Sequence, residues 1–375
     1  MATKSTAPGT DPISSTSAPP ASSTPIALIV GSTGIVGGNL ATHLVHRSWR
    51  VYGLARKPSA ADGIIPVAAD LRDETSVRNA LADVAPQYVF LCTWLRQPTE
   101  AENVRVNGAM TRNLFAALEG AKSLTHAALV TGTKHYLGPF ESYGQTAAET
   151  PFREDTPRLP GENFYYTQED ILFAAAERGG FSWSVHRPHS IVGYALGNAM
   201  NMGVTLAVYA SICRETGQPF VFPGSRLQWN ALADVTDARL LAQHLEWVAL
   251  SGQAHNQAFN VVNGDVFRWR WLWPQIAAHF GVKPAGPPDP IQPLAPKFAD
   301  AGGLWQSIAD KHGLAERDID RLASWWHTDS DLGRQLECVN DMTKSRLLGF
   351  TPYQETRASI FDLFDRLQRE KIIPA

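Results

Sequence analysis

The sequence predicts an α/β protein, with a doubly wound parallel sheet and a smaller, mostly helical carboxyl-terminal region. An apolar, β-branched run at residues 26–30 leads directly into the spacing Gly31, Gly34 and Gly37. Strand-like and helix-like segments then alternate as far as Val192, which is typical of a parallel sheet with right-handed crossovers. Beyond Val192 helical patterns prevail, so a second, smaller region is expected there.

The glycine spacing predicts a strand, a tight turn and a helix, as at the start of a Rossmann-type dinucleotide-binding domain. Gly31 lets the backbone turn sharply, Gly34 lets a pyrophosphate approach the main chain, and Gly37 lets the helix pack close to the strand. The first amides of that helix face the phosphates, and the helix dipole favours their negative charge. Ordinary turns also contain such glycines, so the position directly after the first apolar strand is what supports this interpretation.

The remaining elements of the sheet follow from hydrophobic periodicity. We expect further strands at residues 50–55, 64–68, 88–92, 125–131 and 181–185, and helices at 99–118 and 163–177. In the second region we expect a helix at 199–213, short strands at 219–222 and 258–262, and helices near 304–312, 318–326 and 360–367. Eight of the eleven tryptophans lie beyond Val192, where packing between helices is the expected role for most of them.

Two cations follow the second strand, at the position where an NAD-binding domain usually has an acidic residue for the ribose hydroxyls. Arg56 and Lys57 at this position favour a 2′-phosphate and therefore NADPH. A solvated basic turn is the alternative. Asp70 and Leu71 follow the third strand at a position suited to the adenine ring, and Thr93 follows the fourth at the edge where ligands of open parallel sheets lie.

The overall composition excludes several classes of protein. With 375 residues and a formal charge of −3, the chain has the length for two domains and no basic excess for nucleic acid or an anionic membrane. No apolar run is long enough to span a bilayer, and Cys92, Cys213 and Cys338 show no metal-ligand spacing. An odd number of distant cysteines favours a reducing, cytoplasmic location.

The same patterns suggest domain boundaries. Residues 1–25 are rich in Ser, Thr, Ala and Pro and are expected to form a disordered tail. The nucleotide-binding domain is expected at 26–192, with return strands from about 225–265. Residues 193–224 and 266–375 are expected to form the substrate-binding region.

Short-chain dehydrogenases that act on carbonyls place Tyr and Lys one helical turn apart, and this pair is missing here. Tyr166 lies on a suitable helix, but Asp170 follows it four residues later. The cation must then come from another segment, and Lys134 directly follows the fifth strand, at the carboxyl edge of the sheet. Sequence reasoning leaves Tyr165, Tyr136 and Tyr143 as rivals for the phenol.

Four strings in the chain resemble the progesterone 5β-reductase and iridoid synthase-like enzymes, which are atypical extended short-chain dehydrogenases that reduce enones. The strings are TGTKHYLGPFESYG (131–144), EDTPRLP followed by NFYY (154–166), WSVHRP (183–188) and AFNVVNGDVFRW (258–269). The resemblance extends over nearly all of residues 27–374. The family often has Arg where this chain has Thr133, and Gly and Asn where it has His189 and Ser190.

The resemblance implies 1,4-reduction of an α,β-unsaturated carbonyl by NADPH. Lys134 and Tyr166 match the catalytic positions, with the ammonium lowering the pKa of the phenol so that it stabilises the enolate oxygen. The cofactor residues expected from the motif and the resemblance are Gly31, Thr33, Gly34, Ile35, Val36, Gly37, Arg56, Lys57, Asp70, Leu71, Thr93, Tyr166 and Ile191. The candidate pocket walls are Trp94, Phe140, Met202 and Phe350, each with a core role as its alternative.

The expected partner is a small-molecule enone, and steroid, monoterpene dialdehyde and small cyclic substrates all fit the resemblance. The resemblance also fits a homodimer. Two other classes of function stay open at this point. One is an extended short-chain dehydrogenase that acts on a carbonyl or a sugar nucleotide, which the missing Tyr-x-x-x-Lys pair disfavours. The other is a non-catalytic NADP-binding sensor, which would have no need for both Lys134 and Tyr166.

Overall fold

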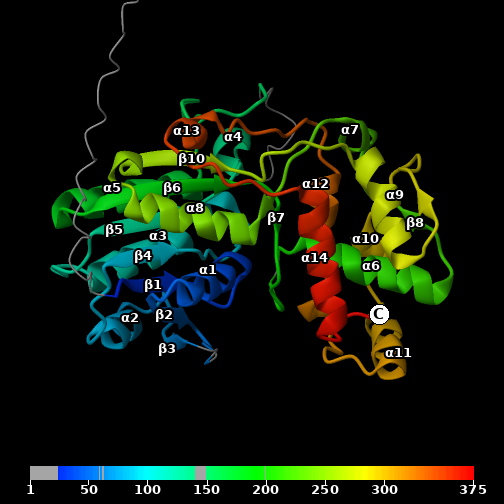
Figure 1. Ribbon diagram of the computed structural model, residues 1–375, viewed down its shortest axis with the longest axis horizontal. Coiled ribbons are helices and arrows are strands. Elements are labelled where there is room, and N and C mark those ends of the chain that lie inside the picture. Colours follow the sequence, from blue (N-terminus) through cyan, green and yellow to red (C-terminus); the bar gives the residue numbers. More distant parts are fainter. Residues whose placement is uncertain (1–23, 59, 61–62, 140–148, 199) are drawn as a thin grey trace, which may run out of the picture.

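Seven parallel strands form the sheet around which the chain is arranged. The computed structural model describes residues 24–58, 60, 63–139, 149–198 and 200–375 (Figure 1). The strand order is β10-β6-β5-β4-β1-β2-β3, which is the doubly wound arrangement predicted from the alternation of elements. The strands are β1 (Ile26–Val30), β2 (Arg50–Ala55), β3 (Ile64–Ala68), β4 (Tyr88–Leu91), β5 (His126–Val130), β6 (Ser182–Pro188) and β10 (Gln257–Val261).

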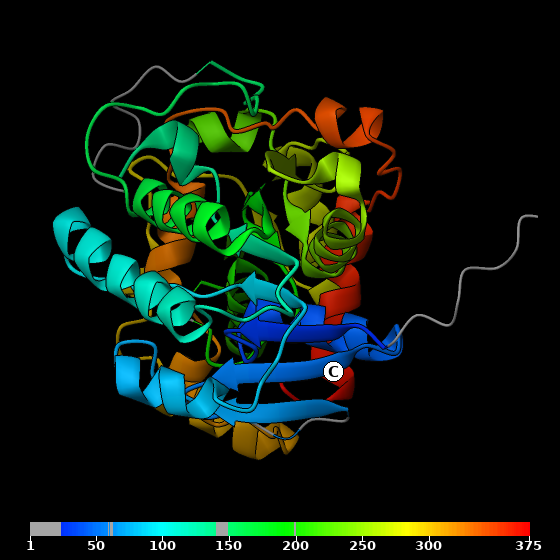
Figure 2. The same cartoon turned by 90° about the vertical axis from the view of Figure 1, so that its left-hand side faces the viewer.

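Helices cover both faces of this sheet (Figure 2). Along β1, Ala27 and Ile29 pack into one core while Leu28 and Val30 pack into the other, because successive side chains of a strand point to opposite faces. The first core is closed by α1 (Ile35–His46) and α8 (Ala238–Leu250). The second is closed by α2 (Glu74–Leu81), α3 (Glu100–Ala117) and α5 (Phe164–Gly179). Burial on both faces explains why these strands are almost continuously apolar.

A second, mostly helical region lies beside the strand ends of the sheet, at the right of Figure 1. Its helices are α6 (Met202–Thr216), α7 (Arg226–Asn230), α9 (Trp269–Phe280), α10 (Leu294–Lys297), α11 (Gly302–His312), α12 (Trp325–Leu332) and α14 (Thr356–Arg369). Two short strands, β8 (Phe220–Val221) and β11 (Pro284–Ala285), pair with each other. Trp273 and Trp305 are fully buried, whereas Trp271 is 51% exposed, so the expected packing role holds for the first two.

The span at 225–265 contains two strands, as expected. Strand β10 pairs with β6 in the main sheet, and β9 (Thr236–Asp237) pairs with β7 (Ile191–Val192). Helix α8, which the sequence analysis did not predict, lies between them. The carboxylate of Asp237 accepts a hydrogen bond from the Arg239 amide and caps this helix. Leu241, Leu245 and Val248 recur at helical spacing on the side that faces α1. The segment at 318–326 differs from the expected helix, because a 3₁₀ turn at Ile319–Arg321 precedes α12.

A buried chain of hydrogen bonds crosses β5, β6, α8 and α13 (Thr343–Leu347). It runs in order through Ser182, His126, Ser184, His186, His244 and Ser345, with contacts of 2.8 to 3.0 Å. The Ser182 hydroxyl donates to the carbonyl oxygen of Thr125, so it must accept from His126 Nδ1. When the rings are neutral, each later bond follows from this one. Ser184 donates to His126, His186 to Ser184, His244 to His186, and Ser345 to His244. The three imidazoles therefore connect elements that are distant in the sequence.

Burial lowers the pKa of each of these imidazoles, to about 3 for His126 and His244 and well below its usual value for His186. All three rings are thus neutral near pH 7. Elsewhere in the described ranges, Cys92, Cys213 and Cys338 are free thiols. No helix in those ranges combines the length and the apolar character that crossing a bilayer requires.

Candidate functional site

The glycine-rich turn between β1 and α1 is built for close approach of the main chain. Gly31 has φ +88°, and a Cβ there would lie 2.6 Å from the Thr93 Cβ. A Cβ at Gly37 would lie 2.2 Å from the carbonyl oxygen of Gly31, so α1 packs directly on the turn. Gly34, the residue before α1, provides no side-chain cap, which leaves amides of the first turn for an anion. The turn therefore fits a pyrophosphate.

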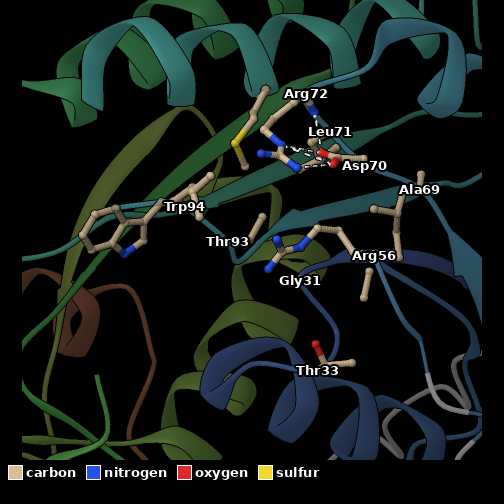
Figure 3. Close-up of a pocket in the computed structure, with 13 residues that line it drawn as sticks. Gly31, Thr33, Arg56, Ala69, Asp70, Leu71, Arg72, Thr93 and Trp94 are labelled. Carbon is tan, nitrogen blue, oxygen red and sulfur yellow. Dashed lines mark hydrogen bonds and ion pairs between the residues drawn. The ribbon is translucent and has the colours of Figure 1, made fainter. Parts of the chain in front are cut away.

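A pocket opens at the carboxyl ends of β1 to β4, next to this turn (Figure 3). Its lining contains Gly31, Thr33, Arg56, Asp70, Leu71, Arg72, Thr93, Trp94 and Met110. Six of these are residues that the sequence assigns to the cofactor, and the structure brings them together from four strand ends. Ligands of open parallel sheets bind at this edge.

Other predicted cofactor residues lie outside the lining of this pocket. Gly34 directly precedes α1, where Ile35 and Val36 have buried side chains, so their backbone amides are what they offer to a phosphate. Lys57 is exposed. Ile191 lies in β7, paired with Thr236 in a separate two-stranded sheet. The structure thus separates Arg56, which lines the pocket, from its neighbour Lys57.

Arg72 is a cation of this pocket that sequence reasoning missed. Its Nε and Nη2 donate to the Asp70 carboxylate at 3.0 and 2.6 Å, as the dashed lines in Figure 3 show. The hydrogen bond from Arg72 lowers the pKa of Asp70 to about 2, and Arg56 adds to the effect. The signal in the sequence was a third cation two residues after Asp70, on the same turn that follows β3.

Lys134 lies at the other end of the site, in the one-turn helix α4 (Lys134–Leu137) that follows β5. Its side chain is 2% exposed. The ammonium forms an ion pair with Glu100, at the start of α3, and lies 4.5 Å from the centre of the Phe164 ring. The structure therefore places Lys134 at the carboxyl edge of β5, as its position in the sequence predicts.

Tyr166 does not pair with Lys134. Its hydroxyl donates to the carbonyl oxygen of His135 at 2.7 Å and accepts from the Leu159 amide at 3.0 Å. The prediction that Lys134 lowers the pKa of this phenol is wrong, because burial raises that pKa and the cations acting on the phenol are Arg158 and Arg187. Both bonding directions of the hydroxyl are taken by backbone groups.

Tyr165, one of the rivals left open by the sequence, points to the end of β5 instead. Its hydroxyl lies 3.4 Å from the ideal Cβ position of Gly132 and has no hydrogen-bond partner among the residues that the structure describes. Burial raises the pKa of this phenol, and the charge of Glu100 adds to the rise. The neutral phenol is thus the form present at neutral pH, which leaves a proton to donate.

The four predicted pocket walls have different surroundings. Trp94 lines the pocket and packs against Phe164, with ring centres 4.9 Å apart. Met202 is buried at the start of α6 and lines a small cavity together with His189 and Ser190. Phe350 packs in a core cluster and contacts His244 and Trp247, so the core alternative describes it. Phe140 lies outside the described residues.

His189 and Ser190, which stand where the family often has Gly and Asn, belong to a buried polar cluster. His189 Nδ1 lies 2.7 Å from the Asp234 carboxylate, and Arg334 Nη1 lies 2.6 Å from His189 Nε2. Because a guanidinium only donates, Nε2 accepts and the ring proton is on Nδ1, facing Asp234. Ser190, with φ +33°, donates to Asp331 at 2.9 Å. The cluster connects the end of β6 to the carboxyl-terminal region.

Comparison with known proteins agrees with this arrangement. Residues 65–374 match the model of the PRISE-like Rossmann-fold domain. The chain is 40% identical to an (S)-8-oxocitronellyl enol synthase of Camptotheca acuminata and 37% identical to a 3-oxo-Delta(4,5)-steroid 5-beta-reductase of Arabidopsis thaliana. Each comparison covers 93% of this chain and 93% of the relative.

Solved structures show the same fold at lower sequence identity. A UDP-glucose 4-epimerase of Thermus thermophilus in complex with NAD superposes with a TM-score of 0.62 and 17% identity. That match covers 92% of this chain and 99% of the epimerase. At this identity the likeness concerns the fold alone. The extent of the family match and the identities to the two plant enzymes show that the chain belongs to the family of PRISE-like Rossmann-fold proteins.

Proposed function

We propose that the protein reduces the C=C bond of an α,β-unsaturated carbonyl compound with NADPH. The observation that supports this most directly is the pair of groups at the carboxyl end of β5, the Lys134 ammonium and the Tyr165 hydroxyl, which no other described residue bonds. The glycine-rich turn and the pocket for a nucleotide lie at the same edge of the sheet. The names of two relatives, an enol synthase and a steroid 5-beta-reductase, point to the same chemistry.

The cations of the pocket support NADPH over NADH. Arg56 lines the pocket directly after β2, and Arg72 lines it after β3. A guanidinium binds a phosphate with two parallel hydrogen bonds, so these positions suit a 2′-phosphate. Lys57 is exposed and is not among the residues that line the pocket, so a solvated basic turn describes it better.

The chemistry places negative charge on the carbonyl oxygen of the substrate. When bound, NADPH supplies the hydride that adds to the β-carbon of the enone. Tyr165 donates a hydrogen bond to the carbonyl oxygen and so stabilises the enolate, whose α-carbon then takes a proton from water. Lys134 lowers the energy of the same charge through space. A phenol with a raised pKa keeps its proton until the oxyanion forms.

We assign the donating phenol to Tyr165 in place of Tyr166, which the family motif had suggested. The Tyr166 hydroxyl holds backbone groups of the segments before α5, so its role in this proposal is to fix the position of α4. The Tyr165 hydroxyl has no hydrogen-bond partner among the described residues. Adjacent helical residues point about 100° apart, so the two phenols cannot exchange roles without a change in α5.

We also propose the position of the substrate, the oligomeric state and the location of the protein. A substrate pocket would extend from Trp94, and substrate size depends on the carboxyl-terminal region. A homodimer and a cytoplasmic location are proposed from the sequence.

Reduction of the carbonyl itself is the competing activity, because extended short-chain dehydrogenases share this fold. Helix α5 lacks the expected lysine, since Glu169 follows Tyr165 and Asp170 follows Tyr166 by four residues. Incubation with NADPH and 2-cyclohexenone, followed by identification of the product, separates the two. Cyclohexanone supports the proposal and 2-cyclohexenol contradicts it. No oxidation of NADPH with a panel of enones of graded size would favour a non-catalytic sensor.

A further inference from the structure

Glu100 joins three segments that meet at Lys134. One carboxylate oxygen, Oε2, accepts from the Lys134 ammonium and from the Asn103 amide at 3.1 Å. The other, Oε1, accepts from the backbone amide of Phe164 at 2.8 Å. Phe164 is the first residue of α5, directly before Tyr165. A single carboxylate thus connects the start of α3, the lysine of α4 and the first turn of α5.

Burial makes this contact important for the charge of Lys134. The lysine side chain is 2% exposed and that of Glu100 is 11% exposed. A buried ammonium without an opposite charge loses its proton readily, because desolvation disfavours the charged form. A hydrogen-bonded carboxylate reverses that preference. The position and the charge of Lys134 therefore both depend on Glu100.

We infer that Glu100 is a positioning residue that holds the Lys134 ammonium, in its charged form, at the carboxyl end of β5, the end to which Tyr165 also points. This inference rests on the proposed function for its kinetic consequence, but the ion pair can be measured without any substrate. The carboxylate acts through Lys134 and through the first turn of α5, and does not itself face the pocket of Figure 3.

The charged and titratable groups around Lys134 in the described part of the chain come from two helices. Glu100 belongs to α3, and Tyr165 belongs to α5. The neighbouring cluster of Glu169, Arg158 and Arg187 surrounds Tyr166 and His135. Removing the negative charge of Glu100 would lower the pKa of the ammonium and also that of the Tyr165 phenol. With both pKa values lowered, Lys134 and Tyr165 would lose their protons at a lower pH than in the wild type.

The test compares Glu100→Gln with Glu102→Gln, a matched control on the same helix. Glu102 pairs with the exposed Arg105 and has no contact with Lys134. We expect Glu100→Gln to shift the alkaline limb of the kcat profile to lower pH by about 1 to 3 units, the usual effect of one close opposite charge. NADPH binding at pH 6 should change little, and Glu100→Asp should recover part of the shift. The control should keep the wild-type profile.

Heteronuclear NMR of the lysine ammonium groups gives the second readout. The Lys134 signal should titrate at lower pH in Glu100→Gln than in the wild type, whether or not an enone is reduced. An unchanged ammonium pKa in Glu100→Gln would overturn the inference. If the glutamine variant does not fold, the wild type and Glu100→Asp test the inference instead. A Lys134 ammonium that titrates like an exposed lysine in both proteins would also overturn the inference. Lack of enone reduction by the wild type, with the NMR shift present, would reject the proposed function alone.

Discussion

The hydroxyl of Tyr166 donates to the backbone carbonyl of His135, with an oxygen-to-oxygen distance of 2.7 Å. This bond ties α5 to the turn of α4 that contains Lys134. It also directs the Tyr166 proton to the backbone, which is why we propose Tyr165 as the phenol of α5 that contacts the substrate. The family motif NFYY contains both tyrosines, and their different bonding makes them separable by experiment.

We expect Tyr165→Phe to lower kcat by about 100-fold or more, the usual cost of removing one oxyanion donor. The same change should leave the Kd for NADPH within a few-fold. Tyr166→Phe should instead lower the free energy of unfolding by about 1 kcal/mol, because it leaves the Leu159 amide without its acceptor. Steady-state kinetics and urea unfolding measure the two effects. A large loss of kcat in Tyr166→Phe, with full activity in Tyr165→Phe, would restore the assignment made from the motif.

Arg56→Ala should raise the KM for NADPH about tenfold or more and leave the KM for NADH nearly unchanged, because the lost contact is specific to the 2′-phosphate. Arg72→Ala should have a smaller effect in the same direction, since this guanidinium is already paired with Asp70. Lys57→Ala is the matched control and should keep both values. Initial rates with each cofactor are the measurement, and equal losses for NADPH and NADH would argue against a 2′-phosphate site.

Gly37→Ala should lower the free energy of unfolding by about 1 to 3 kcal/mol, since its Cβ would lie 2.2 Å from the Gly31 carbonyl oxygen. The displaced turn should also weaken NADPH binding. Gly303→Ala is the control, because a Cβ there meets no other atom within 4 Å and alanine favours the helix α11. Thermal unfolding with and without NADPH checks both variants. Equal stability of the two proteins would contradict the close packing of α1 on the turn.

The buried imidazoles predict a loss of stability in acid. Folded-state pKa values of about 3 for His126 and His244 lie below the unfolded value near 6.5. The unfolded chain therefore binds more protons, so this contribution is complete above pH 6.5 and is lost as the pH falls toward 3. Each such ring lowers the free energy of unfolding by about 1.4 kcal/mol per pH unit within that window.

Urea unfolding between pH 7 and pH 5 measures this slope. His244→Gln removes one titrating ring and should reduce the slope, although its absolute stability will be lower. His46→Gln is the control, because His46 is exposed at the end of α1 and should leave the slope unchanged. A wild-type stability that is flat from pH 7 to pH 5 would show that the imidazoles are protonated in the folded protein.

The sequence by itself determined the sheet and six of the residues that line the pocket. The apolar run at 26–30, the glycine spacing and the alternation of elements predicted β1, α1 and the parallel order, because these signals are local. Helix α8 was missed within 225–265, and α2, capped by Asp73, was also missed. Helix α2 has few apolar positions, and packing against α3 completes it. In α8, Leu241, Leu245 and Val248 recur at a helical spacing that is present in the sequence itself.

The sequence also determined that Lys134 lies at the carboxyl edge of β5, since its place directly after an apolar strand fixes that position. Only the tertiary structure decided that backbone groups bond the Tyr166 hydroxyl, that Arg72 joins Arg56 in the pocket and that Glu100 binds Lys134. The physical reason is that these choices depend on how α3 and α5 are rotated against the sheet. Their rotation is set by packing among residues far apart in the chain, which no local pattern records.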